Sequence, residues 1–557
     1  MSPLNINDRP HTHTEEITVQ APQGGLMGEL SDIAALPQPV ACFKGIPYAL
    51  PPVGVQRWKP AEPAQDWSGD RRALQFGPAC PQLTEDNKQS LFYSPALQTS
   101  EDCLYLNVWT PALTGDQTVR HDATLPVMVW IHGGGLLQGA ASEAIFDGAM
   151  LASKGVVVVS FNYRLGVLGY LSHPALSAES EQGASGNYGT TDQIQALQWV
   201  QRNIAAFGGN PNNVTVFGQS AGALSVSQLM SSDCSRHLFH KAIMQSAYLP
   251  AMPELRNLVY GMPAAEDYGK AFFDAIDSAS DNSSSLAKLR AMPVQSIISA
   301  SCNYAFDKAV VDGWIFKEQI FETFEAGRQS NIPLLAGFTS HECSYFISEG
   351  YIDLPANTQA YENAVAQRYG SLSERYLKLY PSTDLKSSTY LPISHGLYAW
   401  ATERLVRLMA KIDAPAFLYL FDHAPDWAIE KGLQAFHTLE LPYSFNNIAC
   451  NAKYASTWPD LQPLESDLAT AELMSNYWTA FALNGSPQVQ GQPVWDCYRG
   501  EQPALMCFQS GTATLQDHSM KDIFQLHEDI VAERRLHNQS WAYADIGLMS
   551  LPVNHKD

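Results

Sequence analysis

The sequence has 557 residues, of which 45% are hydrophobic and 16% are charged, and its formal net charge is −22 at pH 7. This apolar content excludes an intrinsically disordered chain, and the excess of acidic residues argues against nucleic-acid binding, because it repels a phosphate backbone. No run of about 18 apolar residues occurs, so we predict no transmembrane segment.

The N-terminal residues and the cysteines bear on the cellular compartment. Residues 1–16 are polar and lack the basic start and the apolar stretch of a signal peptide, which predicts a cytoplasmic protein. A periplasmic or secreted protein whose signal peptide has been removed is the alternative. The nine cysteines include no C-x-x-C pair, which argues against a disulfide scaffold or a zinc ribbon and favours isolated buried thiols.

Five apolar runs predict strands that are buried on both faces, as in a parallel sheet. They span residues 125–131, 156–163, 214–217, 332–338 and 416–421. Helical patterns, and not hairpin turns, separate the first three runs. We therefore predict an α/β fold with a central, mostly parallel sheet flanked by helices.

The helix between the second and third of these strands has the clearest pattern. Residues 190–209 place apolar side chains at a three-four spacing, which predicts an amphipathic helix. Thr190 or Thr191 can cap its start, and Gly208 ends it.

No linker and no internal repeat divides the chain, so we predict a single domain over residues 1–557. Residues 250–310 and 355–410 have helical patterns. They are expected to form excursions that cover the active-site end of the sheet.

The motif GQSAG, residues 218–222, connects a predicted strand to a predicted helix. Gly218 and Gly222 leave room for a sharp turn that lifts Ser220 off the end of the strand, beside the N-terminal amides of the helix. This arrangement is typical of a serine nucleophile. An ordinary turn with a capping serine is the alternative.

The motif HGGG, residues 132–135, follows the predicted strand 125–131. Successive glycines allow backbone N–H groups to point into a cavity. Together with the amide of Ala221, those of Gly134 and Gly135 would form an oxyanion hole with three donors. The alternative is a flexible glycine loop.

A serine nucleophile needs a general base, and His437 is the candidate. It lies in the apolar stretch AFHTLELPYSF, residues 435–445. By itself, a histidine in such a stretch is more often a hydrogen-bonded core residue. A second stretch, HECSY at residues 341–345, begins like the zinc motif H-E-x-x-H, but Tyr345 stands where the second histidine is required.

Longer segments identify the family. The sequence resembles the type-B carboxylesterase/cholinesterase-like family of the α/β-hydrolases, most closely its bacterial para-nitrobenzyl-esterase-like branch. The resemblance implies an α/β-hydrolase fold with helical cap insertions and a serine esterase activity. It is carried by FKGIPYALPPVGVQRWKP (43–60), SEDCLYLNVWTP (100–111), FNYRLGVLGYL (161–171), GNYGTTDQIQALQWVQRNIAAFGGNPNNVTVFGQSAGA (186–223), VVDG (310–313), AFHTLELPYSF (435–445) and YWTAFALNGSP (477–487).

This resemblance implies a catalytic triad of Ser220, Glu342 and His437. Ser220 stands in the family's G-x-S-A-G motif, and Glu342 follows a predicted strand at the position of the acid. His437 stands in the family's histidine segment, with Thr438 at a position that is usually small. The oxyanion hole of the family corresponds to Gly134, Gly135 and Ala221.

The resemblance also implies two structural pairs. A buried ion pair of the family corresponds to Glu101 and Arg164, and an N-terminal disulfide corresponds to Cys80 and Cys103. Closing a loop of about 20 residues would add about 3 kcal/mol of stability in an oxidising compartment.

Three residues depart from the family pattern. Gln219 replaces the glutamate that usually precedes the nucleophile, which weakens any preference for cationic esters. Cys343 replaces a glycine after the acid and is expected to demand a backbone adjustment. Leu136 replaces an aromatic residue after the glycines and is expected to alter the acyl pocket.

We therefore predict a serine carboxylesterase that hydrolyses a small-molecule ester through an acyl-enzyme intermediate. This chemistry needs no metal and no organic cofactor. A lipase-like, amide-cleaving or carbamate-cleaving enzyme with the same triad is one alternative, and a non-catalytic binding homologue is another.

Overall fold

The computed structural model describes residues 16–83, 90–92, 97–276, 285–450, 457–460, 462–499, 504–517, 520–541 and 545–551. Residues 1–15, which carry most of the signal-peptide expectation, lie outside the described residues.

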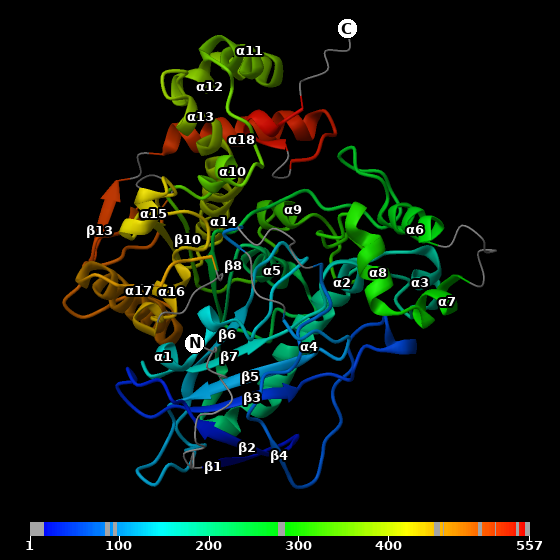
Figure 1. The fold of residues 1–557 in the computed structure, drawn as a ribbon, viewed down its shortest axis with the longest axis vertical. Helices are drawn as coiled ribbons and strands as arrows, with labels where there is room; N and C mark the ends of the chain where they lie inside the picture. The colour runs from blue at the N-terminus through cyan, green and yellow to red at the C-terminus, as the bar shows by residue number, and fades with distance from the viewer. Residues whose placement is uncertain are drawn as a thin grey trace, which may run out of the picture.

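The strands form a 13-stranded sheet. They are β1 (Glu16–Ala21), β2 (Gly24–Leu30), β3 (Ala41–Pro47), β4 (Asp70–Arg72), β5 (Tyr105–Thr110), β6 (Leu125–Ile131), β7 (Val157–Phe161), β8 (Gly209–Gln219), β9 (Lys241–Gln245), β10 (Leu334–Thr339), β11 (Ala416–Phe421), β12 (Ala504–Gln509) and β13 (Thr512–Asp517). Their order is β1-β2-β3-β5-β7-β6-β8-β9-β10-β11-β12-β13, and β4 pairs with β2. The sheet runs from β1 at one end of the molecule, through β6–β8 in its middle, to β13 at another edge (Figure 1).

Every pairing from β7 to β12 is parallel. The outer pairings β1–β2, β2–β3, β3–β5, β5–β7 and β12–β13 are antiparallel, and the short β4 pairs with β2 in parallel. The residues of β7, β9 and β10 are all buried, because helices cover both faces of the sheet. The predicted α/β fold with a mostly parallel sheet is confirmed. Strands β6 and β11 have the predicted bounds, and both ends of β10 lie within two residues of its predicted bounds.

The helices are α1 (Ala149–Ala152), α2 (Gly166–Tyr170), α3 (Pro174–Glu179), α4 (Tyr188–Asn203), α5 (Ala221–Ser231), α6 (Ala265–Ile276), α7 (Ser285–Ala291), α8 (Val294–Ala300), α9 (Ile320–Glu325), α10 (Tyr345–Ser348), α11 (Thr358–Tyr369), α12 (Ser373–Leu379), α13 (Leu385–Ser394), α14 (Trp400–Ala410), α15 (Asp426–Glu430), α16 (Leu441–Ser444), α17 (Glu465–Asn484) and α18 (Lys521–Leu536). A π-helix, His395–Ala399, joins α13 to α14. None of the helices in the described part of the chain combines the length and the apolar character needed to span a bilayer.

Helix α4 begins earlier than predicted. Its first residue is Tyr188, and the hydroxyl of Thr191 donates to the carbonyl of Tyr188 within the first turn, so the expected capping by threonine is wrong. The predicted end is confirmed, because the following 3₁₀ turn stops at Gly208 with a φ of 78°.

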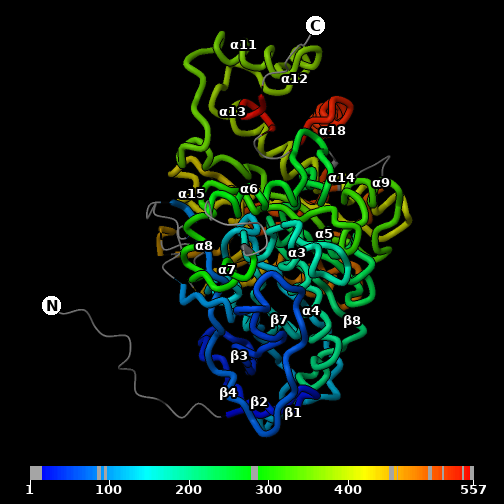
Figure 2. The backbone as a smooth tube through the Cα atoms, turned by 90° about the vertical axis from the view of Figure 1, so that its right-hand side faces the viewer, coloured from blue at the N-terminus to red at the C-terminus, as the bar shows by residue number. Residues whose placement is uncertain are grey.

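Both predicted excursions contain helices. The first holds α6, α7 and α8, and the second holds α11 to α14. Two views place α11, α12 and α13 together with α18 at one end of the molecule and β1–β4 at the opposite end (Figures 1 and 2). That the whole chain forms one domain stays a prediction.

The predicted ion pair between Glu101 and Arg164 is wrong. Glu101 binds Arg57 through two contacts of 2.6 Å. Arg164 instead binds Asp192 of α4, which accepts hydrogen bonds from its guanidinium at 2.7 and 2.8 Å and from its backbone amide at 2.9 Å. Since Asp192 offers Arg164 three contacts at once, it outcompetes a more distant carboxylate.

Removing one partner of the buried pair of Arg164 and Asp192 should strongly destabilise the fold, because the other charge is then buried without a counter-charge. Asp192→Asn leaves the Arg164 guanidinium, which is 3% exposed, without its counter-charge. We expect this variant to lower the free energy of unfolding by about 3–5 kcal/mol in urea titrations. Asp66→Asn is the control, because Asp66 pairs with Arg202 at the surface; its unfolding midpoint should equal that of the native protein. Equal effects of the two variants would contradict the prediction.

Candidate active site

Ser220 stands on a strained turn between β8 and α5. Its backbone has φ 56° and ψ −123°, a conformation that L-residues rarely adopt. The turn is held on both sides, because the Ser220 amide donates to the carbonyl of Gln245 at 2.9 Å and its carbonyl accepts from Leu224 at 2.9 Å. The structure therefore has the sharp turn that the GQSAG motif predicts.

The two glycines of this motif are required by close backbone contacts. A Cβ atom on Gly218 would lie 2.5 Å from the carbonyl carbon of Gly222. A Cβ atom on Gly222 would lie 2.0 Å from the carbonyl oxygen of Ile131. Helix α5 can approach β6 and β8 this closely only because both positions lack a side chain.

Glu342 follows β10 and is completely buried. Its Oε1 accepts hydrogen bonds from the hydroxyl of Ser246 at 2.6 Å and from the amide of Thr339 at 2.7 Å. Its Oε2 lies 2.5 Å from Nδ1 of His437. The structure thus joins two residues 95 positions apart, and this contact leaves Nε2 of His437 available as a proton acceptor.

Ser220 and His437 line the same cavity, which has a volume of about 760 Å³. The Ser220 hydroxyl forms no hydrogen bond with another described residue. Aromatic side chains make up much of the cavity wall, among them Phe92, Tyr248, Phe306, Tyr345 and Tyr398. A cavity of this size can enclose a drug-sized ligand.

Gly134 and Gly135 also line this cavity. Both have a positive φ, and a Cβ atom on Gly134 would lie 2.0 Å from the carbonyl oxygen of Gln138. Among the described residues, no hydrogen bond takes its donor from the amides of these two glycines. Ala221 is the first residue of α5, where helix amides have no partner within the helix.

Two departures from the family pattern have outcomes that differ from the expectations. Cys343 is not among the described residues with a positive φ, so its side chain needs no backbone adjustment, and its amide donates to Ser394. Leu136 is fully buried and is not one of the residues that line the cavity, whereas Leu137 lines it. Leu136 itself has a φ of 61°, and Thr438, a β-branched residue, has a φ of 77°, so both are in the left-handed region that favours glycine.

Gln219 is buried beside the imidazole of His437. Its amide nitrogen lies 3.2 Å from Nε2 and 3.5 Å from Nδ1 of that ring. The shorter contact is with Nε2, the ring nitrogen that Glu342 does not bind, so the Gln219 amide can donate to it in the absence of substrate.

Sequence reasoning missed two residues that contact the predicted triad. Ser246 follows β9, and its position at the carboxyl end of a parallel strand was a usable signal. Tyr398 stacks on His437 with ring centroids 4.4 Å apart. No local sequence pattern predicts the contact of Tyr398 with His437, because Tyr398 lies in a helical segment far from His437 in the chain.

Cys80 and Cys103 lie side by side as buried free thiols. The amide of Leu165 also donates to the sulfur of Cys80 at 3.4 Å. The hydrogen bond with the neighbouring Cys80 thiol, and after it burial, raise the pKa of the Cys103 thiol well above its usual value. A disulfide between the two stays a prediction.

Fold and site together define the class, which is the α/β-hydrolases: a parallel sheet, a serine on a strained strand-to-helix turn and a buried acid–histidine pair. The model of the carboxylesterase family matches residues 15–525, so the chain belongs to the carboxylesterase family. This confirms the predicted resemblance.

Known relatives agree with this assignment. Fumonisin B1 esterase from Sphingopyxis macrogoltabida is 35% identical over 476 residues, covering 83% of this chain and 82% of that protein. Para-nitrobenzyl esterase from Bacillus subtilis (strain 168) is 34% identical over 474 residues, covering 82% and 89%. A solved PNB esterase structure has a TM-score of 0.76 at 30% identity, covering 92% of this chain and 99% of that one. The chain is a serine carboxylesterase.

A second buried carboxyl group, that of Glu440, lies near the site. Burial, with a further contribution from Glu342, raises the pKa of Glu440 from 4.5 to about 8, so this side chain is protonated near neutral pH. Its Oε1 accepts from the amide of Gln245 at 3.3 Å.

This raised pKa has a consequence for stability. As the pH rises from 4.5 toward 8, the unfolded chain releases the Glu440 proton while the folded chain keeps it, so the contribution of this group to stability falls. Glu440→Gln replaces the titrating group by a neutral amide, so the stability of this variant no longer falls with pH through this group. We expect the variant to gain about 4 kcal/mol over the native protein at pH 8 and about 1 kcal/mol at pH 5, in urea titrations at both values. Glu181→Gln, at an exposed site, is the control. A gain that is independent of pH would contradict the prediction.

Proposed function

We propose that Ser220, His437 and Glu342 are the nucleophile, the general base and the orienting acid of this carboxylesterase. The observation that carries the proposal is the 2.5 Å contact between Glu342 and Nδ1 of His437, beside a cavity that Ser220 and His437 both line. The three residues follow the order of the family's triad along the chain.

Hydrolysis proceeds in two halves. The Ser220 hydroxyl attacks the ester carbonyl carbon while Nε2 of His437 takes its proton, and the imidazolium then gives this proton to the leaving alcohol. Water repeats these steps on the acyl-enzyme and releases the acid. Glu342 holds the tautomer with the proton on Nδ1 and stabilises the imidazolium.

The oxyanion of each tetrahedral intermediate binds the amides of Gly134, Gly135 and Ala221. The absence of any described internal acceptor for the two glycine amides supports this role, since free donors are what a developing negative charge requires.

The preferred substrates are uncharged esters with a bulky or aromatic part. Aromatic residues cover much of the cavity wall, and among the described residues that line it, Asp307 and Lys308 pair with each other at 2.9 Å. Gln219 adds no charge beside Ser220. Relatives named for quite different esters, fumonisin B1 and para-nitrobenzyl esters, support a cavity that tolerates varied shapes.

The nucleophile is tested by Ser220→Ala. We expect kcat/KM for p-nitrophenyl butyrate to fall by at least about 10⁴-fold, because no other hydroxyl replaces the attacking group. The circular dichroism spectrum and the melting temperature should stay close to the native ones. Native-like turnover in a folded variant would refute the proposed role.

The charge preference is tested with a pair of isosteric substrates. The native enzyme should have a higher kcat/KM for 3,3-dimethylbutyl butyrate than for butyrylcholine, because the one carboxylate among the described lining residues, that of Asp307, is paired with Lys308. Gln219→Glu adds such a charge and should raise the choline-to-neutral ratio about tenfold, less at high salt. Gln182→Glu, which adds the same charge at an exposed position, is the control. A native preference for the choline ester would contradict the proposal.

A further inference from the structure

The π-helix between α13 and α14 carries the aromatic ring that covers a face of His437. Tyr398 of this turn stacks on the imidazole with ring centroids 4.4 Å apart and planes inclined by 30°. It also lines the cavity that contains Ser220. π-Helical turns are rare and are frequent at functional sites.

His437 needs such a neighbour because Glu342 holds it at one atom. The hydrogen bond to Nδ1 fixes the position of that nitrogen but lets the ring tilt about it. Tilting would swing Nε2 away from Ser220. A flat ring packed on the imidazole face opposes this motion, and a misplacement of about 1 Å can cost 10²-fold in rate.

Helix α18 packs directly on the π-helix. A Cβ atom on Gly396 would lie 2.6 Å from Nδ1 of His527, so this position admits no side chain. The hydroxyl of Tyr380 lies 3.0 Å from both Nδ1 of His395 and Nε2 of His527, which bridges the π-helix to α18. Burial lowers the pKa of both histidines to about 3, so the bridge carries no charge near neutral pH.

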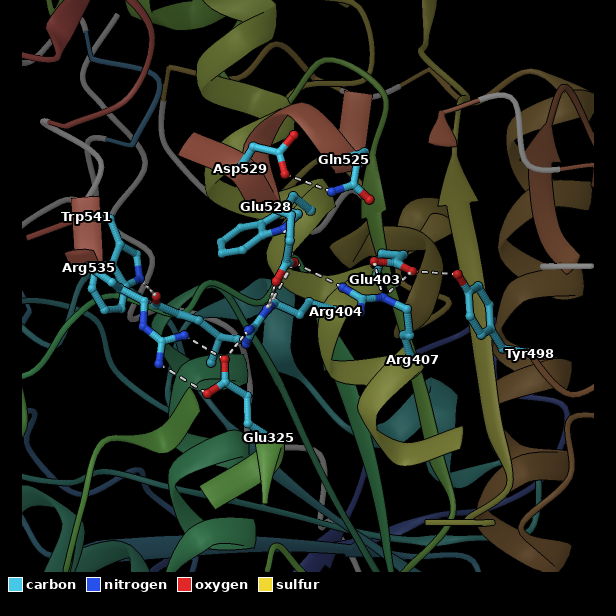
Figure 3. A network of polar contacts seen from close by, with 12 residues as sticks. Glu325, Glu403, Arg404, Arg407, Tyr498, Gln525, Glu528, Asp529, Arg535 and Trp541 are labelled. Atoms are coloured by element: carbon cyan, nitrogen blue, oxygen red, sulfur yellow. Dashed lines mark hydrogen bonds and ion pairs between the residues drawn. The ribbon is translucent and has the colours of Figure 1, made fainter. Parts of the chain in front are cut away.

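The next residue of α18, Glu528, extends this contact to α14. Its carboxylate accepts from the indole of Trp400 at 3.0 Å, from Arg404 at 3.2 Å and from Arg407 at 3.1 Å. Figure 3 shows Glu528 pointing from α18 toward Arg404 and Arg407. Trp400 begins α14 directly after the π-helix, so Glu528 holds the end of the segment that carries Tyr398.

We propose that Tyr398 is a positioning residue for His437 and that α18 is the brace that holds it in place. The inference rests on the proposed function, because it takes His437 as the general base. It links a C-terminal helix, outside the predicted triad and the cavity wall, to the rate of the chemical step.

The positioning role is tested by comparing Tyr398→Leu with Tyr398→Phe. Leucine fills the space but lacks a flat ring, so we expect kcat to fall by about 10- to 100-fold while KM changes less than about threefold. Phenylalanine keeps the ring and should restore most of the lost kcat. A raised KM with native kcat would indicate that Tyr398 acts by contacting the substrate. Equal losses of kcat in both variants would indicate that it acts through its hydroxyl. Either result would overturn the proposal.

The brace is tested with Glu528→Gln. We expect kcat to fall about three- to tenfold in this variant, with little further loss when it is combined with Tyr398→Leu, because both act through the same ring. Asp529→Asn is the matched control, since Asp529 lies on the same helix but binds Arg375 instead. Additive losses, or an equal loss in Asp529→Asn, would overturn the brace.

These outcomes are separate from those of the proposed function. An active Ser220→Ala variant would refute the triad itself. An inactive Ser220→Ala variant together with a fully active Tyr398→Leu variant would refute only the role of Tyr398.

Discussion

The burial of the Glu342 carboxylate is the constraint on which the site depends. A carboxylate removed from water is very costly unless its oxygens are satisfied by hydrogen bonds. Here Ser246, Thr339 and His437 satisfy it, from three separate segments of the chain. The carboxylate can therefore be buried only when the loops after β9 and β10 and the segment around His437 are all in place.

The parallel sheet makes this convergence possible. Strands β8, β9 and β10 are neighbours, and their carboxyl ends carry Ser220, Ser246 and Glu342 in turn. Backbone hydrogen bonds connect these strand ends, because the amide of Ser220 donates to the carbonyl of Gln245 and the amide of Ser246 donates to the carbonyl of Gly337. Both serines have a positive φ, so the sheet holds two strained residues side by side where the chain leaves it.

The sequence predicts those features that local pattern determines. The β-branched runs predict the central strands because both of their faces are buried, and the spacing of Gly218 and Gly222 predicts the turn at Ser220. The partner of Arg164 is not predictable in this way, since the choice between Glu101 and Asp192 depends on how α4 packs.

Tertiary contacts of the imidazole escape prediction for the same reason. Gln219 is next to Ser220 in the chain, yet its contact with the ring of His437 depends on a segment 218 residues away. The stacking of Tyr398 depends on a π-turn, which has no sequence signature, and on how α18 packs against that turn.

The surroundings of His437 also limit its charge environment. Glu440 is protonated near neutral pH because burial raises its pKa to about 8, and Gln219 is uncharged. Of the three side chains, only Glu342 can present a negative charge to the imidazole. In the proposed mechanism, this single buried acid, placed at Nδ1 and away from the attacking atoms, stabilises the imidazolium when the serine proton arrives.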